Sequence, residues 1–336
     1  MTKHLALLLL STLLLFTSCI RGEDYENTPE DNFRALWTIL DEHYCFFDYK
    51  AQEIGLDWNS VFQKHHDRLS PKMDSKQLFE VLSDMLSELR DGHVNLYASH
   101  DVARNWSWHE DYPANFNDSV HRLYLGTDYK IASSLRYKIL TDNIGYMYCP
   151  SFGSGLGDGN ISQALSYFAD CTGIIVDVRE NSGGELTNAE KLAARFTNEK
   201  ILVGYMSHKT GPGHQDFSPL EEVWLEPSDG IRWQKKVVVL TNRSCYSATN
   251  DFVKSMKQCP QVTVIGDQTG GGSGMPFSSE LPNGWSVRFS ACPIYDVDKK
   301  HTEFGIQPDI KVSMRTEDLM KNKDTLIEFA REYLKK

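Results

Sequence analysis

The chain has 336 residues, of which 40% are hydrophobic and 24% are charged, and its formal net charge at pH 7 is −11. This composition excludes an intrinsically disordered chain and predicts an acidic globular protein. Because no run of Lys and Arg occurs, nucleic acids and anionic lipid surfaces are not expected as partners.

The N-terminus is predicted to be an export signal, over residues 1–18. A mainly apolar run from Leu5 to Phe16 is shorter than the ~20 residues that cross a bilayer, but it fits the core of a signal peptide. Thr17 and Ser18 before Cys19 resemble the end of a bacterial lipoprotein signal, in which cleavage exposes a cysteine that is then lipidated. We therefore expect a protein lipid-anchored at Cys19 in the bacterial cell envelope, on its periplasmic or outer side. An ordinary secretory signal is the alternative.

The first part of the mature chain is predicted to be helical. Residues 21–29 are polar and contain a proline, which indicates that residues 19–29 form a tether. Residues 30–96 indicate a helical subdomain, because apolar residues recur at helical spacing, namely Phe33, Leu36, Trp37, Leu40, and then Leu78, Phe79, Leu82, Met85, Leu86 and Leu89. Asp74 and Ser75 are the expected N-cap of the second of these helices. Residues 97–136 predict connecting strands and loops.

Residues 137–336 predict an α/β core in which strands alternate with helices. The expected strands are 144–148, 173–178, 236–240, 262–265 and 286–291, and the expected helices are 186–196, 247–256 and 316–334. The apolar run at 173–178 is typical of a strand that is buried on both faces.

Six cysteines besides Cys19 are widely spaced, without a Cys-x-x-Cys pair, so a zinc site is not expected. The sequence indicates no particular disulfide. Cys149 and Cys292 lie in apolar runs and are predicted to be small buried side chains.

Four short motifs carry groups suited to acyl transfer. They are Asp91-Gly92-His93-Val94, residues 179–184 (Arg-Glu-Asn-Ser-Gly-Gly), residues 246–250 (Tyr-Ser-Ala-Thr-Asn) and residues 303–309 (Glu-Phe-Gly-Ile-Gln-Pro-Asp). In order, they offer a histidine base, a glycine turn with free N–H groups, a serine at a helix start and a carboxylate before a turn. Each also has an ordinary structural interpretation, and for Ser247 it is a simple helix N-cap.

Together these motifs resemble those of the tail-specific (C-terminal-processing) serine peptidase family. The closer resemblance is to the branch of that family that includes the tricorn core and proteins similar to interphotoreceptor retinoid-binding protein. The resemblance covers roughly residues 30–315. It implies an α/β fold with a ClpP/crotonase-like β/α spiral core and a small N-terminal helical subdomain. It also implies a serine peptidase that needs no metal or organic cofactor and acts on peptide or protein substrates.

The sequence departs from the family pattern in two places. Members with a Ser/Lys dyad carry a lysine in the loop after the nucleophile helix, whereas residues 268–274 contain none. Lys254 lies about two turns beyond Ser247 on the same helix, which is too far to act as the base. Many members also insert a PDZ domain of about 90 residues, and the stretch 97–143 is too short for a full one.

The resemblance therefore implies a triad of Ser247, His93 and Glu303. Asp91 and Asp298 are rival carboxylates for the third position. An imidazole with an ordinary pKa near 6.5 would make activity rise through the neutral range.

The expected oxyanion hole combines the N–H of Gly183 or Gly184 with the N–H of Ala248.

The main alternative to a peptidase is a non-catalytic protein of the same fold that binds peptides or apolar ligands. CoA-dependent acyl chemistry is a further alternative, but no basic patch for the CoA phosphates is visible.

Overall fold

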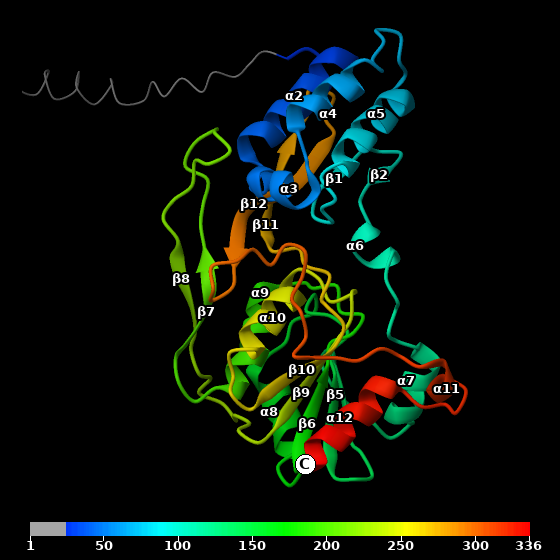
Figure 1. The fold of residues 1–336 in the computed structure, drawn as a ribbon, viewed down its shortest axis with the longest axis vertical. Coiled ribbons are helices and arrows are strands. Elements are labelled where there is room, and N and C mark those ends of the chain that lie inside the picture. The colour runs from blue at the N-terminus through cyan, green and yellow to red at the C-terminus, as the bar shows by residue number, and fades with distance from the viewer. Residues whose placement is uncertain (1–24) are drawn as a thin grey trace, which may run out of the picture.

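The computed structural model describes residues 25–336, so the predicted signal peptide and Cys19 lie outside the described residues. Two parts are stacked along the long axis of the molecule (Figure 1). One part holds four N-terminal helices and an antiparallel sheet, and the other holds a larger sheet covered by helices on both faces. The four motifs lie where the two parts meet.

The N-terminal part packs four helices against a sheet. The helices are α2 (Pro29–His43), α3 (Phe47–Ile54), α4 (Trp58–His66) and α5 (Ser75–Ser87). The expected N-cap is confirmed, because the Asp74 side chain accepts hydrogen bonds from the backbone of Lys76 and Gln77. The predicted apolar stripes lie in the core of this part, where Phe33, Leu82 and Met85 pack with Val287 and Phe289 of the sheet.

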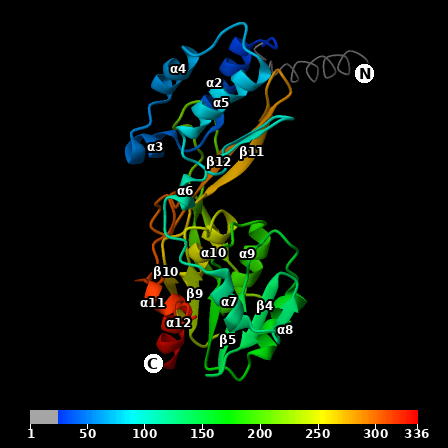
Figure 2. The ribbon, with the colours of Figure 1, turned by 90° about the vertical axis from the view of Figure 1, so that its right-hand side faces the viewer.

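The sheet of this part has the order β2-β1-β12-β7-β8, with β11 also paired to β12. Its strands are β1 (Asn95–Tyr97), β2 (Val102–Ala103), β7 (Ile201–Met206), β8 (Glu221–Leu225), β11 (Gly274–Glu280) and β12 (Ser286–Tyr295). The long strands β11 and β12 run from the larger part up to the helices (Figure 2). Segments from the middle and the end of the chain thus complete the N-terminal part.

The larger sheet has the order β13-β10-β9-β6-β5-β4-β3. It is parallel from β13 to β5 and antiparallel at β4 and β3. Its strands are β3 (Lys130–Ala132), β4 (Leu135–Ile139), β5 (Ile144–Tyr148), β6 (Gly173–Asp177), β9 (Val237–Thr241), β10 (Val262–Gly266) and β13 (Ile310–Lys311).

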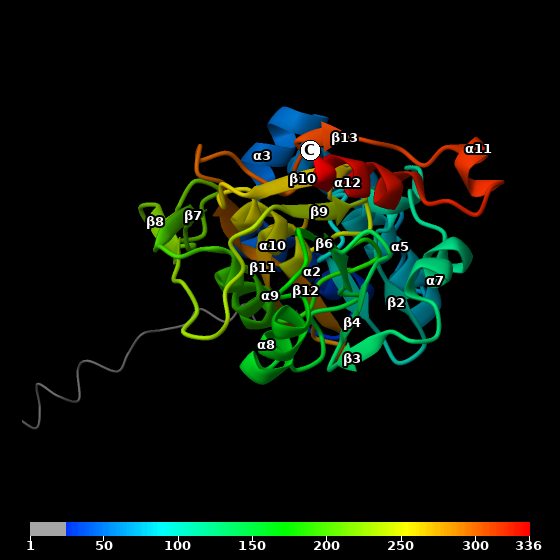
Figure 3. The same ribbon diagram turned by 90° about the horizontal axis from the view of Figure 1, so that it is seen from below.

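Helices cover both faces of this sheet, and the alternation of side chains along β9 shows how. Val237 and Val239 belong to the core under α8 (Asp158–Tyr167), α9 (Leu186–Ala193) and α10 (Ala248–Met256). Val238 and Leu240 belong to the core under α7 (Asp118–Leu125) and α12 (Thr325–Lys335). Seen from below, α12 and α8 lie on opposite sides of the strands (Figure 3). A central strand buried on both faces must be apolar throughout, which is why residues 237–240 are unbroken aliphatic residues.

The expected α/β class with an N-terminal helical region is confirmed, and residues 25–336 contain no PDZ domain. The stretch 97–136 instead holds short elements, including two helices that the sequence did not predict, α6 (Ser107–Glu110) and α7. Within residues 25–336, no helix combines the length and the apolar character that a membrane crossing requires.

The predicted closing helix over 316–334 is wrong as one continuous element. It is divided into α11 (Thr316–Leu319) and α12 by a turn in which Asn322 has a φ of 56°. The physical reason is a new helix start, since the Asp324 side chain caps α12 by accepting from the backbone of Leu326 and Ile327.

Arg179 joins this C-terminal helix to the larger sheet. Its guanidinium is fully buried and pairs with Asp177 at 2.7 Å and with Asp324 at 3.0 Å. It also donates to the carbonyl of Asn115 at 3.1 Å. The arginine of the second motif therefore has a structural role away from the reacting groups.

Replacing Arg179 with Met should lower the free energy of unfolding by about 3–5 kcal/mol, because two buried carboxylates lose their counter-charge. Urea unfolding followed by circular dichroism measures the change. Arg122→Met is the matched control, since it removes one arginine from an exposed pair with Asp118 and should cost under about 0.5 kcal/mol. A loss of less than about 1 kcal/mol for Arg179→Met would contradict the structural role.

Candidate active site

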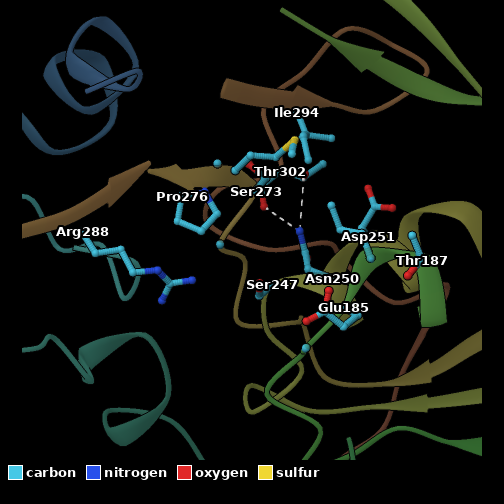
Figure 4. Close-up of a pocket in the computed structure, with 15 residues that line it drawn as sticks. Glu185, Thr187, Ser247, Asn250, Asp251, Ser273, Pro276, Arg288, Ile294 and Thr302 are labelled. Carbon is cyan, nitrogen blue, oxygen red and sulfur yellow. Dashed lines mark hydrogen bonds between the residues drawn. The ribbon is translucent and has the colours of Figure 1, made fainter. Parts of the chain in front are cut away.

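The motif residues gather at the carboxyl ends of the parallel strands β6 and β9, where α/β proteins commonly bind ligands. The glycine turn follows β6, and Ser247 follows β9 at the start of α10. The N-terminal part supplies His93 from the loop between α5 and β1. Figure 4 shows Ser247 beneath a cavity whose far wall comes from β11 and β12.

Ser247 occupies a strained backbone position. Its φ of 56° and ψ of −122° are unusual for a residue other than glycine, and its side chain makes no capping hydrogen bond to α10. A simple N-cap is therefore not what the structure shows. Backbone hydrogen bonds hold the turn, because Ser247 N–H donates to Gly271 at 2.8 Å and Tyr246 N–H donates to Asn181 at 3.2 Å. Strain of this kind costs about 1–3 kcal/mol and is concentrated at functional sites.

His93 and Ser247 are 154 positions apart in the sequence, yet His93 Nε2 lies 3.0 Å from Ser247 Oγ. The Asp91 carboxylate fixes the histidine loop by accepting the His93 backbone N–H at 2.7 Å. Gly92 between them is needed for space, since a Cβ there would lie 2.6 Å from Trp108 Nε1 and 2.8 Å from the Tyr246 hydroxyl. The first motif thus encodes a loop that presents its imidazole to the serine.

The His93 ring is buried, and burial lowers its pKa to about 4. The negative charge of Asp91 opposes this shift of the pKa, and the positive charge of Arg288 adds to it. The expected pKa near 6.5 is therefore wrong, because the sequence does not reveal the loss of water around the ring. A neutral imidazole at pH 7 can accept a proton from Ser247 without first losing one.

The other ring nitrogen, Nδ1, has no hydrogen bond of good geometry among residues 25–336. A backbone acceptor at Gly274 raises the pKa of His93, but Nδ1 has no partner in the described chain that meets hydrogen-bonding geometry. Tyr246 supports the ring from the side, with the two ring centroids 5.1 Å apart in an edge-to-face arrangement.

Glu303 is buried in the same region, but it makes no hydrogen bond to His93. Its carboxylate accepts the Ser273 backbone N–H at 2.9 Å and the Lys50 ammonium at 3.2 Å. Burial, and then the charge of Asp91, raise the pKa of Glu303 to about 8. Glu303 thus lies near the site, but the direct contact with the His93 imidazole that a triad requires is not observed.

The two rival carboxylates differ sharply in position. Asp298 is 70% exposed and lies beside Lys300 at the surface, so it does not reach His93. Asp91 is buried and accepts hydrogen bonds from Tyr44 at 3.0 Å and Ser290 at 2.9 Å. Lys50 and His93 lower the pKa of Asp91 against the effect of its burial, so this group is ionised at neutral pH.

Lys50 is the site residue that sequence reasoning missed. It comes from α3 in the N-terminal part, and its side chain is fully buried. Besides Glu303, its ammonium contacts the carbonyl of Arg90 at 3.1 Å and lies 4.7 Å from the Phe304 ring centroid. A lysine on a short amphipathic helix gives no local signal, because only the packing of the two parts makes it the counter-charge of two buried carboxylates.

The candidate oxyanion donors are Gly184 and Ala248. Gly183 N–H donates to the Asn181 side chain at 2.9 Å, so it is not free, whereas neither of the other two N–H groups has a partner in the described chain. Gly183 is needed for space, since a Cβ there would lie 2.9 Å from the Cβ of Ser247.

No lysine competes with His93 for the serine within residues 25–336. Lys254 is buried and pairs with Asp251 at 2.6 Å, and it makes no contact with Ser247. In the same residues, no cluster of His, Cys, Asp and Glu has the arrangement of a metal site. The six described cysteines are buried and unpaired.

Two cavities adjoin Ser247. One, of about 380 Å³, is lined by Glu185, Asp251 and the apolar residues Leu186, Met275 and Ile294. The other, of about 440 Å³, contains His93 and is lined by Arg104, Arg288, Tyr97, Trp106 and Trp108. Arg288 lines both cavities, so the two differ in the acidic and apolar side chains of the first and the aromatic side chains of the second.

Comparisons with known proteins place this site in a family. The model of peptidase family S41 matches residues 143–312, and that of the tricorn protease C1 domain matches residues 25–87. The crystal structure of a candidate peptidase from Parabacteroides merdae is 53% identical, has a TM-score of 0.88, and is matched over 92% of this chain and 97% of that one. The chain belongs to peptidase family S41.

More distant relatives match in part. The tricorn protease of Thermoplasma acidophilum is 25% identical over 190 residues, which are 56% of this chain and 16% of that protein. A "Probable CtpA-like serine protease" of Staphylococcus epidermidis is 24% identical over 174 residues, 51% of this chain and 34% of that protein. The chain thus matches 16% and 34% of the length of these two relatives. The photosystem II D1 C-terminal processing protease shares the fold, with a TM-score of 0.54 at 13% identity over 85% of this chain and 93% of that one.

The low pKa of His93 can be measured by an NMR titration of the imidazole signals, assigned by their absence in His93→Gln. We expect the ring to protonate near pH 4. Arg288→Gln should raise the pKa, because it removes a nearby positive charge. A transition near pH 6.5 that Arg288→Gln leaves in place would show that the ring is hydrated rather than buried.

Proposed function

We propose that the chain is a serine peptidase of the cell envelope in which Ser247 is the nucleophile and His93 is the general base. The observation that carries this proposal is the 3.0 Å contact between His93 Nε2 and Ser247 Oγ at a strained turn beside free backbone N–H groups. Peptide or protein substrates follow from family membership and from the two cavities that adjoin the serine.

In the proposed reaction, Ser247 Oγ attacks the scissile carbonyl while His93 Nε2 accepts the hydroxyl proton. The N–H groups of Gly184 and Ala248 then stabilise the oxyanion. His93 passes the proton to the leaving amine, and water hydrolyses the acyl-enzyme by the same steps in reverse order. A neutral His93 at pH 7 is ready for the first proton transfer.

We propose that two carboxylates share the role of the third triad residue. Asp91 acts on His93 through space, since it is the charge that most raises the pKa of the imidazole. Glu303 acts indirectly, because it holds Lys50 and the backbone of Ser273 next to the histidine. The negative charge of Asp91 stabilises the imidazolium formed during the reaction, whereas the positive charge of Lys50 opposes it.

The location in the envelope, with a lipid anchor at Cys19, is supported by the residue pattern of the first 19 positions. The main alternative function is a non-catalytic protein of the same fold that binds peptides or apolar ligands. The experiments on the serine separate the two.

A fluorophosphonate probe should label Ser247, and the purified full-length chain should hydrolyse denatured casein. Ser247→Ala should remove both activities, and His93→Ala should reduce labelling by several orders of magnitude, because these groups act as a unit. Lys254→Met is the matched control and should keep both activities. Casein hydrolysis that survives in Ser247→Ala would overturn the assignment, and a chain that folds but neither labels nor hydrolyses would favour the non-catalytic alternative.

Asp91→Asn and Glu303→Gln compare the two carboxylates at constant side-chain size. We expect Asp91→Asn to lower the labelling rate by about 10² or more, as for other losses of electrostatic stabilisation, and Glu303→Gln to lower it by less. Thermal unfolding shows whether each variant keeps its fold. A larger loss in Glu303→Gln would instead give Glu303 the direct role that the sequence predicts.

A further inference from the structure

Trp108 packs against three separate segments of the site. It belongs to α6, which lies at the junction of the two parts (Figure 2). Its ring stacks on the Tyr246 ring, with 4.1 Å between the ring centroids. A Cβ on Gly92 would lie 2.6 Å from its Nε1, and a Cβ on Gly270 would lie 2.5 Å from its six-membered ring. The glycines at these two positions therefore make room for this one ring.

Two of these contacts lie next to the reacting groups. Gly92 precedes His93 in the first motif, and Tyr246 precedes Ser247 in the third. The Tyr246 ring also contacts the His93 ring, with centroids 5.1 Å apart. Trp108 therefore contacts the residue before the base and the residue before the nucleophile.

The third contact supports the backbone of the nucleophile. The carbonyl of Gly271 accepts the Ser247 N–H at 2.8 Å, and the neighbouring Gly270 N–H donates to the carbonyl of Cys245 at 2.7 Å. These hydrogen bonds help to hold Ser247 at its positive φ. Because the Trp108 ring packs against Gly270, it supports this strained turn as well.

Arg243 fixes the backbone of α6 at Trp108. This arginine is only 5% exposed, and within residues 25–336 its guanidinium forms no ion pair. It donates instead to three carbonyls, at 2.9 Å to Trp108, 2.6 Å to Thr269 and 3.3 Å to Phe304. Burying a charge is costly unless it is compensated. The three hydrogen bonds compensate this charge only while α6 lies against the loops that contain Thr269 and Phe304.

Trp108 also forms a wall between two cavities. It lines the cavity of about 440 Å³ that contains His93, and it lines another of about 620 Å³ whose walls include Arg243 and Phe304. Removing the ring would therefore connect the two cavities and open a path for water to the Tyr246 and His93 rings.

We propose that Trp108 is a positioning residue that holds Tyr246 against the His93 imidazole and keeps water from that ring, and that Arg243 fixes Trp108 in place. The inference rests on the proposed peptidase function. It gives α6, which lies outside all four motifs, a role in aligning the base with the nucleophile.

Trp108→Ala tests the alignment through the rate at which the fluorophosphonate probe labels Ser247 in the full-length chain. We expect this rate to fall about ten- to hundred-fold at pH 8, because a small misplacement of a catalytic group can cost about 10² in rate. Trp108→Phe keeps an aromatic ring over Tyr246 and should recover most of the loss. Trp224→Ala is the matched control, because it removes an equally large ring that is 41% exposed on β8, and it should label at the rate of the parent.

The protonation of His93 separates a positioning role from a general loss of stability. In Trp108→Ala water reaches the imidazole, so an NMR titration should show its pKa rising from about 4 toward 6.5. Only the neutral ring accepts the serine proton. The labelling rate of the variant should therefore fall further between pH 8 and pH 5.5, whereas the rate of the parent should stay nearly constant over this range.

Arg243→Met shows whether the arginine acts through Trp108. Alone, it should slow labelling by a smaller factor than Trp108→Ala does. In the double variant the loss should be smaller than the product of the two single losses, because both changes release the same contact. Losses that multiply would contradict the role given to Arg243. Arg243→Lys, which keeps the charge, replaces Arg243→Met if that variant does not fold.

A folded Trp108→Ala chain that labels as fast as the parent would overturn the inference and leave the peptidase assignment intact. So would a loss that is equal at every pH and leaves the pKa of His93 near 4, because that result indicates a structural role alone. Trp108→Leu gives the same readouts if Trp108→Ala does not fold. Absence of labelling in the parent would instead count against the proposed function, and the NMR titration of His93 then confirms or refutes the inference without catalysis.

Discussion

The site depends on a buried ionic contact between the two parts of the molecule. Lys50 on α3 pairs with Glu303 from the C-terminal region, and Asp91 lies close enough for the charge of Lys50 to lower its pKa. Charges without water are costly unless they compensate one another, so this cluster favours one arrangement of the N-terminal helices over the larger sheet. That arrangement is the one that sets the His93 imidazole beside the serine of the other part.

The serine side of the site is built by backbone constraint rather than by charge. The apolar strand β9 ends at Thr241, and hydrogen bonds from the following turn to Asn181 and Gly271 hold Ser247 at a positive φ. Packing of α10 against the sheet offsets the strain of that turn. The result is a side chain that points away from its own helix, together with an Ala248 N–H that has no backbone partner.

Burial also changes the chemistry expected from composition alone. The same loss of water lowers the pKa of His93 to about 4 and raises that of Glu303 to about 8. At neutral pH the base is therefore unprotonated, and the pKa of Glu303 lies well above that of Asp91. This pattern, in which environments push the pKa values of nearby groups apart, is typical of acid–base sites.

The sequence by itself determined the α/β class, the N-terminal helices and the four segments that form the site. Their signals are local. Examples are the unbroken aliphatic run of β9, the Asp74 cap, and glycines at positions where a Cβ would collide with neighbouring atoms. The tertiary structure alone decided the partner of Glu303, the role of Lys50 and the exclusion of Asp298. These features depend on which side chains become buried and on which distant segments of the chain come into contact. A local pattern of residues encodes neither.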